Sequence, residues 1–101
     1  MSNTVQGDIV TLVLTNGAEV IGKLTGESET YYQLDRPRMV QASQQGVGLV
    51  NGVCMTGEEP KGDLKFNKSG VIFSIKTVEE MAKGYRTQVS GLVLPTDGLR
   101  V

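Results

Sequence analysis

The sequence predicts a mainly β domain that ends in one amphipathic helix, and three features carry this prediction. Two runs rich in β-forming residues, 9–14 and 19–25, flank the dipeptide Asn16-Gly17, which favours the tight turn of a β-hairpin. The spacing of apolar residues changes from every second residue to a helical period at Thr77. A chain of 101 residues has the length of one domain with a single core.

The first two runs predict a hairpin with one face in the core. A two-residue type I′ turn brings three pairs together on that face: Ile9 with Leu24, Thr11 with Gly22 and Val13 with Val20. The other face is more apolar than a solvated sheet face, since it carries Val10, Leu12, Leu14 and Ile21. We therefore expect another element or another subunit to cover it.

Further extended runs follow in the middle of the chain. The run 30–34 is rich in β-formers, and Pro37 is expected to limit it to an edge, a bend or a strand end. Residues 46–55 are apolar and glycine-rich and predict a fourth strand, either with bulges or interrupted at Asn51 and Gly52. We also expect a loop over 56–63, followed by two strands at 64–66 and 71–76 that are joined by a turn over 67–70.

A helix over about 78–90 is expected to come next. Thr77 and Glu80 have the spacing of a capping box, and Gly91 suits the position after the last turn. The helical stripe expected to pack on the sheet is Val78, Met81, Ala82, Tyr85 and Val89. Gly84 inside the helix costs about 1 kcal/mol relative to alanine, so tertiary packing must hold this element. Residues 92–101 form a tail.

Composition excludes several classes of function. The chain has no histidine, which removes histidine general bases, Ser/His and Cys/His nucleophile pairs and histidine-bound zinc. Its single cysteine, Cys54, allows neither an internal disulfide nor a cysteine metal cluster and is expected in the core. We expect no enzyme activity, no cofactor and no metal.

Charge and hydropathy also bear on location and partners. The net charge is −1, so a nucleic-acid surface would have to be local. No apolar run reaches the roughly 18 residues of a membrane span, and the first residues lack the pattern of a signal peptide. These features predict a cytoplasmic protein without a membrane partner.

Two segments resemble the motifs of the Sm-like family. Asn16, Gly17, Val20, Gly22 and Leu24 fit the first motif, within DIVTLVLTNGAEVIGKL. Residues 64–76, LKFNKSGVIFSIK, look like a degenerate second motif, and the order of elements is similar to that of small Sm-like proteins of tailed marine phages. The resemblance implies one domain over 1–101: a strongly bent five-stranded antiparallel barrel over about 8–76, the helix and the tail.

The resemblance also implies a homo-oligomeric ring that binds single-stranded RNA. Family members that hold uridine have an Asp and a Met-Asn pair after the second strand, where this chain has Ser28 and Tyr31-Tyr32. Asn67 and Lys68 occupy the turn of the second motif, which lines the central opening of such rings. The candidate RNA-binding residues are therefore Ser28, Tyr31, Tyr32, Asn67 and Lys68, with stacking by a tyrosine and a phosphate contact by Lys68.

Other interpretations of these residues remain open. Arg36-Pro37-Arg38 is either an edge that discourages aggregation or a phosphate clamp. Glu27 and Glu29 fit a solvated loop and would repel phosphate, and Asp35 beside Arg36 fits a surface ion pair. The replacement of the family's Asp and Asn favours an alternative function, a purely architectural oligomer of phage assembly without a nucleic-acid site.

Overall fold

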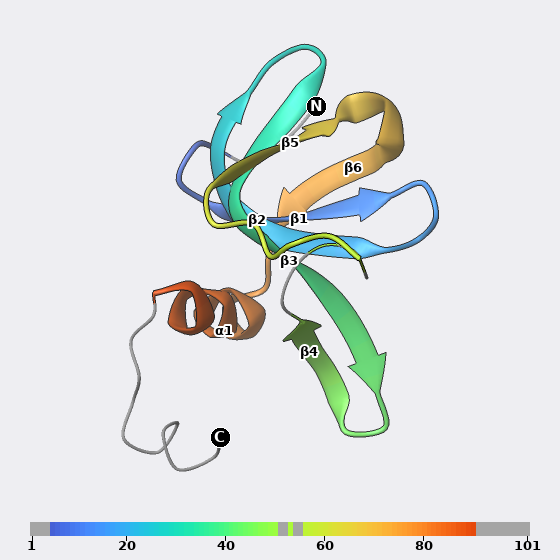
Figure 1. Cartoon of the computed structure of the whole chain (residues 1–101), viewed down its shortest axis with the longest axis vertical. Helices are drawn as coiled ribbons and strands as arrows, with labels where there is room; N and C mark the ends of the chain where they lie inside the picture. Colours follow the sequence, from blue (N-terminus) through green and yellow to red (C-terminus); the bar gives the residue numbers. More distant parts are fainter. Residues whose placement is uncertain (1–4, 51–52, 54–55, 91–101) are drawn as a thin grey trace.

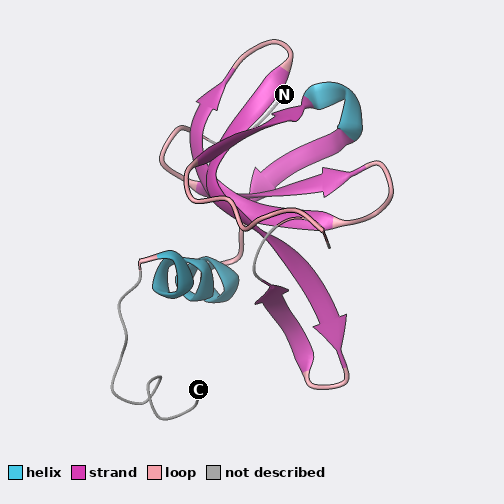
Figure 2. Ribbon diagram, in the orientation of Figure 1, coloured by secondary structure: helices cyan, strands magenta, loops and turns pink. Residues whose placement is uncertain are grey.

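The computed structural model describes residues 5–50, 53 and 56–90 (Figure 1). Its strands are β1 (Ile9–Leu14), β2 (Glu19–Glu27), β3 (Tyr31–Ser43), β4 (Gly46–Val50), β5 (Asp63–Asn67) and β6 (Val71–Lys76). A 3₁₀ turn, η1 (Lys68–Gly70), joins β5 to β6, and the helix α1 (Glu79–Val89) follows β6 (Figure 2). The expected mainly β fold with a helix after the strands is confirmed.

The six strands form one antiparallel sheet. Its order is β4-β3-β2-β1-β6, and β5 also pairs with β3. This double pairing is possible because β3 has 13 residues: residues 31–35 pair with β5 and residues 39–43 pair with β4. Within the described residues β4, β5 and β6 each pair with one strand, and the sheet is not closed. The sheet thus has six strands, whereas the resemblance implies five.

A strand end at Pro37 is wrong, because β3 continues through it, whereas a bend, one of the expected alternatives, agrees with the structure. Arg36 and Pro37 together oppose Gly22 of β2, which makes a bulge, and Arg36 has a φ of 43°. The missing N–H of Pro37 is tolerated at this bulge. Gly22 is required there, because a Cβ at this position would lie 2.9 Å from the Cβ of Leu34.

The hairpin turn is one residue longer than expected. The amide of Leu14 bonds to the carbonyl of Ala18, and Gly17 has a φ of 88°, as in a three-residue loop that ends in a left-handed glycine. The side chain of Asn16 accepts a hydrogen bond from the amide of Ala18. Leu12 therefore pairs with Val20, and the expected pairing of Val13 with Val20 is wrong.

This register puts a different face of the hairpin into the main core. The core cluster is Val10, Leu12, Val20, Leu24 and Leu34. A second cluster lies on the opposite face, where Ala82 and Tyr85 of α1 cover Ile9 and Ile21. The expectation that another element or another subunit covers Val10, Leu12, Leu14 and Ile21 is thus met within the chain, and these residues provide no argument for an oligomer.

The helix begins at Glu79, but its expected cap is wrong. The N-cap position is Val78, which has no side-chain cap and is 67% exposed, so it is not part of the packed stripe. Thr77 is buried, and its hydroxyl lies 2.8 Å from that of Thr11 on β1. Thr77 therefore fastens the start of the helix to the sheet. Because Thr77 makes no capping hydrogen bond, the loss of a cap cannot explain a lower stability of a Thr77 variant.

Replacing Thr77 by valine tests this role. The variant should lose about 1 kcal/mol of unfolding free energy, because the hydroxyl of Thr11 is left buried without a partner. Thr11→Val should cost a similar amount, and the double variant should cost less than the sum of the two, as expected for a shared bond. Urea denaturation measures all three. Additive losses would show that the two hydroxyls act independently.

Some expectations concern residues outside the described part of the chain. They are the burial of Cys54, the conformation of Gly91, the tail 92–101 and most of the run 46–55 beyond Val50. The predicted loop before β5 and the strands on either side of the 67–70 turn agree with the structure.

Candidate nucleic-acid interface

The five candidate residues lie together at one end of the sheet. Tyr31 pairs with Asn67 across β3 and β5, and the next pair is Tyr32 with Phe66. The amide of Ser28 bonds to the carbonyl of Tyr31, and the amide of Lys68 bonds to the carbonyl of Thr30. The β2–β3 turn and the start of η1 are thereby held side by side.

Ser28 organises the turn. Its hydroxyl oxygen accepts hydrogen bonds from the amides of Thr30 and Tyr31 at 3.1 and 3.2 Å. It also lies 3.3 Å from the hydroxyl of Thr30. These local bonds are typical of serine in turns, and they fix the position at which Tyr31 begins β3. Ser28 is therefore a positioning residue for the tyrosines.

Tyr32 and Lys68 form a cation–π pair on the core side of the sheet. The ammonium of Lys68 lies 4.8 Å from the centre of the Tyr32 ring, which packs against the main core. Lys68 also forms an ion pair of 2.8 Å with Glu27. The hydrogen bond that the ammonium of Lys68 donates to Glu27 raises the pKa of Lys68 above its usual value, so the ammonium stays charged but is already paired.

Tyr31 forms a second cation–π pair with Lys65, a residue that the sequence pattern did not single out. The ammonium of Lys65 lies 4.7 Å from the centre of the Tyr31 ring. Neighbouring residues of a strand point to opposite faces, so this pair lies on the other face of the sheet from Tyr32. Lys65 pairs with Gln33, which follows Tyr31 by two residues on the same face. Antiparallel pairing of the predicted strands 30–34 and 64–66 in this register could have indicated the contact between Lys65 and Tyr31.

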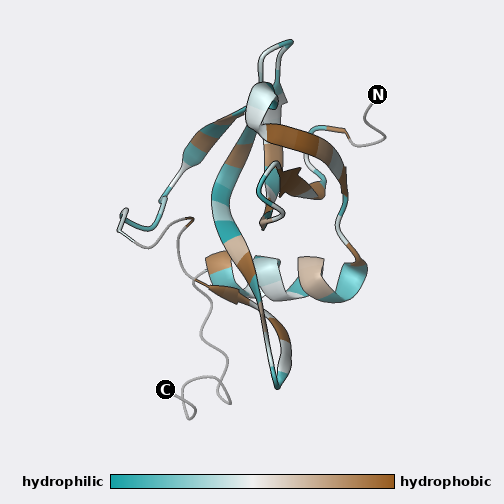
Figure 3. Cartoon of the chain, turned by 90° about the vertical axis from the view of Figure 1, so that its right-hand side faces the viewer, coloured by the Kyte–Doolittle hydropathy of each residue, from teal (hydrophilic) through white to brown (hydrophobic). Residues whose placement is uncertain are grey.

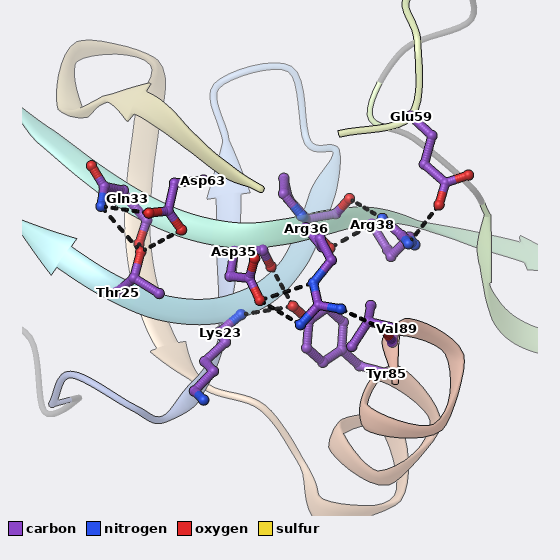
Figure 4. Close-up of polar contacts among 11 residues, drawn as sticks. Lys23, Thr25, Gln33, Asp35, Arg36, Arg38, Glu59, Asp63, Tyr85 and Val89 are labelled. Carbon is purple, nitrogen blue, oxygen red and sulfur yellow. Dashed lines mark hydrogen bonds and ion pairs between the residues drawn. The ribbon is translucent and has the colours of Figure 1, made fainter. Parts of the chain in front are cut away.

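A polar cluster continues this outer face away from the turn. The amide group of Gln33 donates to Thr25 and to Asp63, at 3.3 and 3.1 Å, and the hydroxyl of Thr25 donates to Asp63 at 3.0 Å (Figure 4). These bonds connect β2, β3 and β5 beside Tyr31 and Lys65. Asn67 completes the face at the end of β5, where its side chain is exposed. The result is an outer face with one aromatic ring, one ammonium, the carboxylate of Asp63 and several amide and hydroxyl groups.

The arginines on either side of Pro37 contact α1 and the loop before β5, not the candidate interface. Arg36 forms a 2.7 Å ion pair with Asp35, as expected, and donates to the carbonyl of Val89 at the end of α1. The guanidinium of Arg38 is buried and bonds to Gln88. It also bonds to Glu59 (Figure 4). The interpretation of these residues as a phosphate clamp is therefore wrong. They fix the helix and the loop before β5 to the sheet.

The described residues contain neither a metal-binding cluster nor a membrane-spanning helix. No group of three or more acidic, cysteine or histidine side chains among them could hold a metal ion. None of the helices in the same residues is long and apolar enough to cross a membrane.

Comparison with known proteins adds no assignment. No protein-family model matches the chain, and no curated protein matches it.

Proposed function

We propose that the chain is an Sm-like subunit that closes into a barrel, assembles into a homo-oligomeric ring and binds single-stranded RNA. The observation that carries the proposal is the pairing of two tyrosines with two lysines, Tyr31 with Lys65 and Tyr32 with Lys68, at one end of the sheet. Aromatic rings beside ammonium groups suit a base that stacks and a phosphate that follows it. The resemblance of residues 8–24 and 64–76 to the two family motifs supports it.

Two strand edges support assembly. In the described residues β5 pairs only with β3 and β6 pairs only with β1, so each has one edge open for pairing with another chain. The strand β6 keeps three large apolar side chains exposed, Ile72, Phe73 and Ile75, and Figure 3 shows the hydrophobic colour over this strand. A contact between β5 of one subunit and β6 of the next joins two different surfaces, and such contacts generate rings when the rotation closes.

The geometry favours the Tyr31–Lys65 face as the main RNA contact. Lys65 has no acidic partner among the described residues, whereas Lys68 is bound to Glu27. Stacking on Tyr31 is tolerant of base identity, because every base has an aromatic face. With Ser28 holding the turn and no carboxylate or amide at the family's uridine positions, we expect little preference for uridine over adenine.

The alternative is an architectural ring without a nucleic-acid site. The ion pair between Glu27 and Lys68 favours it, because it neutralises the lysine that the resemblance assigns to phosphate. The two functions differ in one measurable property, the binding of RNA by an intact oligomer.

Sedimentation followed by fluorescence anisotropy tests the proposal. The mass should be several times that of one chain, and the oligomer should bind short poly-U and poly-A with similar, salt-sensitive affinity. Tyr31→Ala should weaken binding by about 5- to 150-fold, the equivalent of one stacked base at about 1–3 kcal/mol. Lys65→Ala should weaken it and lower the salt slope by about 0.7 for each phosphate that is no longer neutralised.

Lys83→Ala is the matched control, since it removes the same charge from the exposed face of α1. It should leave affinity and salt slope unchanged. A ring that binds no RNA at low salt would favour the architectural function. A stable monomer at micromolar concentration would contradict the ring itself.

A further inference from the structure

An apolar trough is lined by residues of α1 and β4. These two elements lie at the end of the molecule away from β5 (Figure 1). It has a volume of about 220 Å³ and is lined by Val47, Gly48 and Leu49 of β4 and by Met81, Gly84 and Gln88 of α1. Val47 and Met81 also line a neighbouring hollow of about 370 Å³ over the sheet. Val47 is 57% exposed, so the described residues leave this surface uncovered.

Gly84 lines the trough and has no side chain. A Cβ at this position would meet nothing within 4 Å, so no described residue requires a glycine there. Glycine inside a helix is unfavourable relative to alanine. A segment of backbone that lies against α1 at this point would explain the glycine, because it needs the space that a side chain would take.

The strand β4 presents an open edge to an added segment. It is an end strand of the sheet and pairs only with β3 in the described part of the chain. Gly46 and Gly48 alternate with Val47 and Leu49 along it, so a backbone can approach closely between apolar side chains. Extended peptides bind such edges through main-chain hydrogen bonds and apolar pockets.

We propose that residues 92–94 of the same chain, Leu92-Val93-Leu94, fold back along α1 and occupy this trough beside β4. The segment begins two residues after Ser90, and Gly91 stands where helices commonly reverse direction. Gly84 lies about 9 Å from Ser90 along the helix axis, at about 1.5 Å per residue. After a turn at Gly91, the three extended residues 92–94 span about 10 Å, so Leu94 reaches the level of Gly84 before Pro95 ends the run.

The position of the trough makes the chain's own tail the favoured occupant. Gln88 lines the end of the trough nearest to Ser90, so the segment is tethered at its entrance. Tethering raises the local concentration to the millimolar range, which a partner in solution rarely reaches. The proposal does not depend on a ring or on RNA binding, because it uses neither β5 nor β6.

Hydrogen exchange of the full chain, resolved by NMR, tests the proposal. The amides of residues 92–94 should exchange about tenfold or more slowly than in the variant Leu92→Asp with Leu94→Asp. The amides of β4 should lose protection in the same variant. The matched control, Thr96→Asp with Gly98→Asp, adds the same two charges beyond Pro95 and should leave both sets protected.

Gly84→Ala provides a second measurement that does not depend on the tail amides. With the apolar tail released by the two aspartates, alanine should raise Tm by about 4–8 °C through its helix propensity. With the native tail it should raise Tm less, or lower it, because the methyl group displaces the segment. An equal rise in both backgrounds would overturn the proposal.

Two results of the exchange experiment would also overturn it. One is exchange of residues 92–94 at the rate of an unstructured peptide in the unmodified protein. The other is an isotope-filtered contact between tail and trough of different chains in a mixed-label sample, which would assign the trough to the tail of a second copy.

Discussion

Replacing Tyr85 by alanine should lower the unfolding free energy by about 3–5 kcal/mol, the usual loss for a large aromatic side chain in a core. Tyr85 is 1% exposed and fills the space between α1 and the second core cluster, against Ile9 and Ile21. Its hydroxyl donates to the carbonyl of Asp35 and accepts from the amide of Lys23 at 3.3 Å. One side chain thus joins the helix to two strands.

Tyr85→Phe separates the hydroxyl from the ring. It should cost about 1–3 kcal/mol, because two backbone groups lose a partner in a partly buried site. Urea denaturation with an unchanged m-value measures both variants. Val78→Ala is the control on the same helix: its side chain is exposed, and its effect should stay within about 0.5 kcal/mol. If Tyr85→Ala cost as little as this control, the helix would not be anchored by Tyr85.

The hydroxyl also gives a pH dependence. Burial raises the pKa of Tyr85 above its ordinary value of 10.0. The folded protein then holds this proton to a higher pH than the unfolded chain, so the stabilisation is complete below pH 10 and is lost as pH rises through the folded pKa. The difference in stability between the native protein and Tyr85→Phe should therefore shrink above pH 10.

The first hairpin shows how far local sequence determines this fold. The run of β-forming residues located β1 at its observed bounds, and Asn16-Gly17 located the turn. Both faces of the hairpin are apolar, however, so hydrophobicity could not decide which face enters the main core. That choice depends on a turn one residue longer than the two-residue loop typical of Asn-Gly, with only Gly17 in the left-handed region.

The candidate site was predicted as a group but not in its contacts. Strand pairing brings Tyr31 beside Asn67, and the sequence pattern placed both at the correct ends of their strands. The pairing of Lys68 with Glu27 spans 41 residues, and the pairing of Lys65 with Tyr31 depends on the register of β5. Neither can be derived from local periodicity. The same holds for Arg38, whose partners lie in a loop and in α1.

Arg38→Ala should lower the unfolding free energy by about 2–3 kcal/mol, and the reason is burial rather than charge. The side chain is 3% exposed, and its guanidinium donates to the carbonyls of Arg36 and Pro37 at 3.1 Å, in addition to Gln88 and Glu59. Its removal leaves the two carbonyls of the bulge without this donor and empties the space of the apolar stem. Arg38→Lys should recover only part of the loss, because an ammonium cannot reproduce the planar fork.

Glu59→Gln distinguishes the two explanations of that loss. The side chain of Glu59 is 42% exposed, so its ion pair with Arg38 is screened by water, and the variant should cost at most about 1 kcal/mol. Arg86→Ala, which breaks an exposed ion pair with Glu79, is the control for removing an arginine charge. Urea denaturation should show a much larger loss of unfolding free energy for Arg38→Ala than for Glu59→Gln or Arg86→Ala. If Glu59→Gln cost as much as Arg38→Ala, the ion pair rather than the support of the β3 bulge would hold this part of the fold.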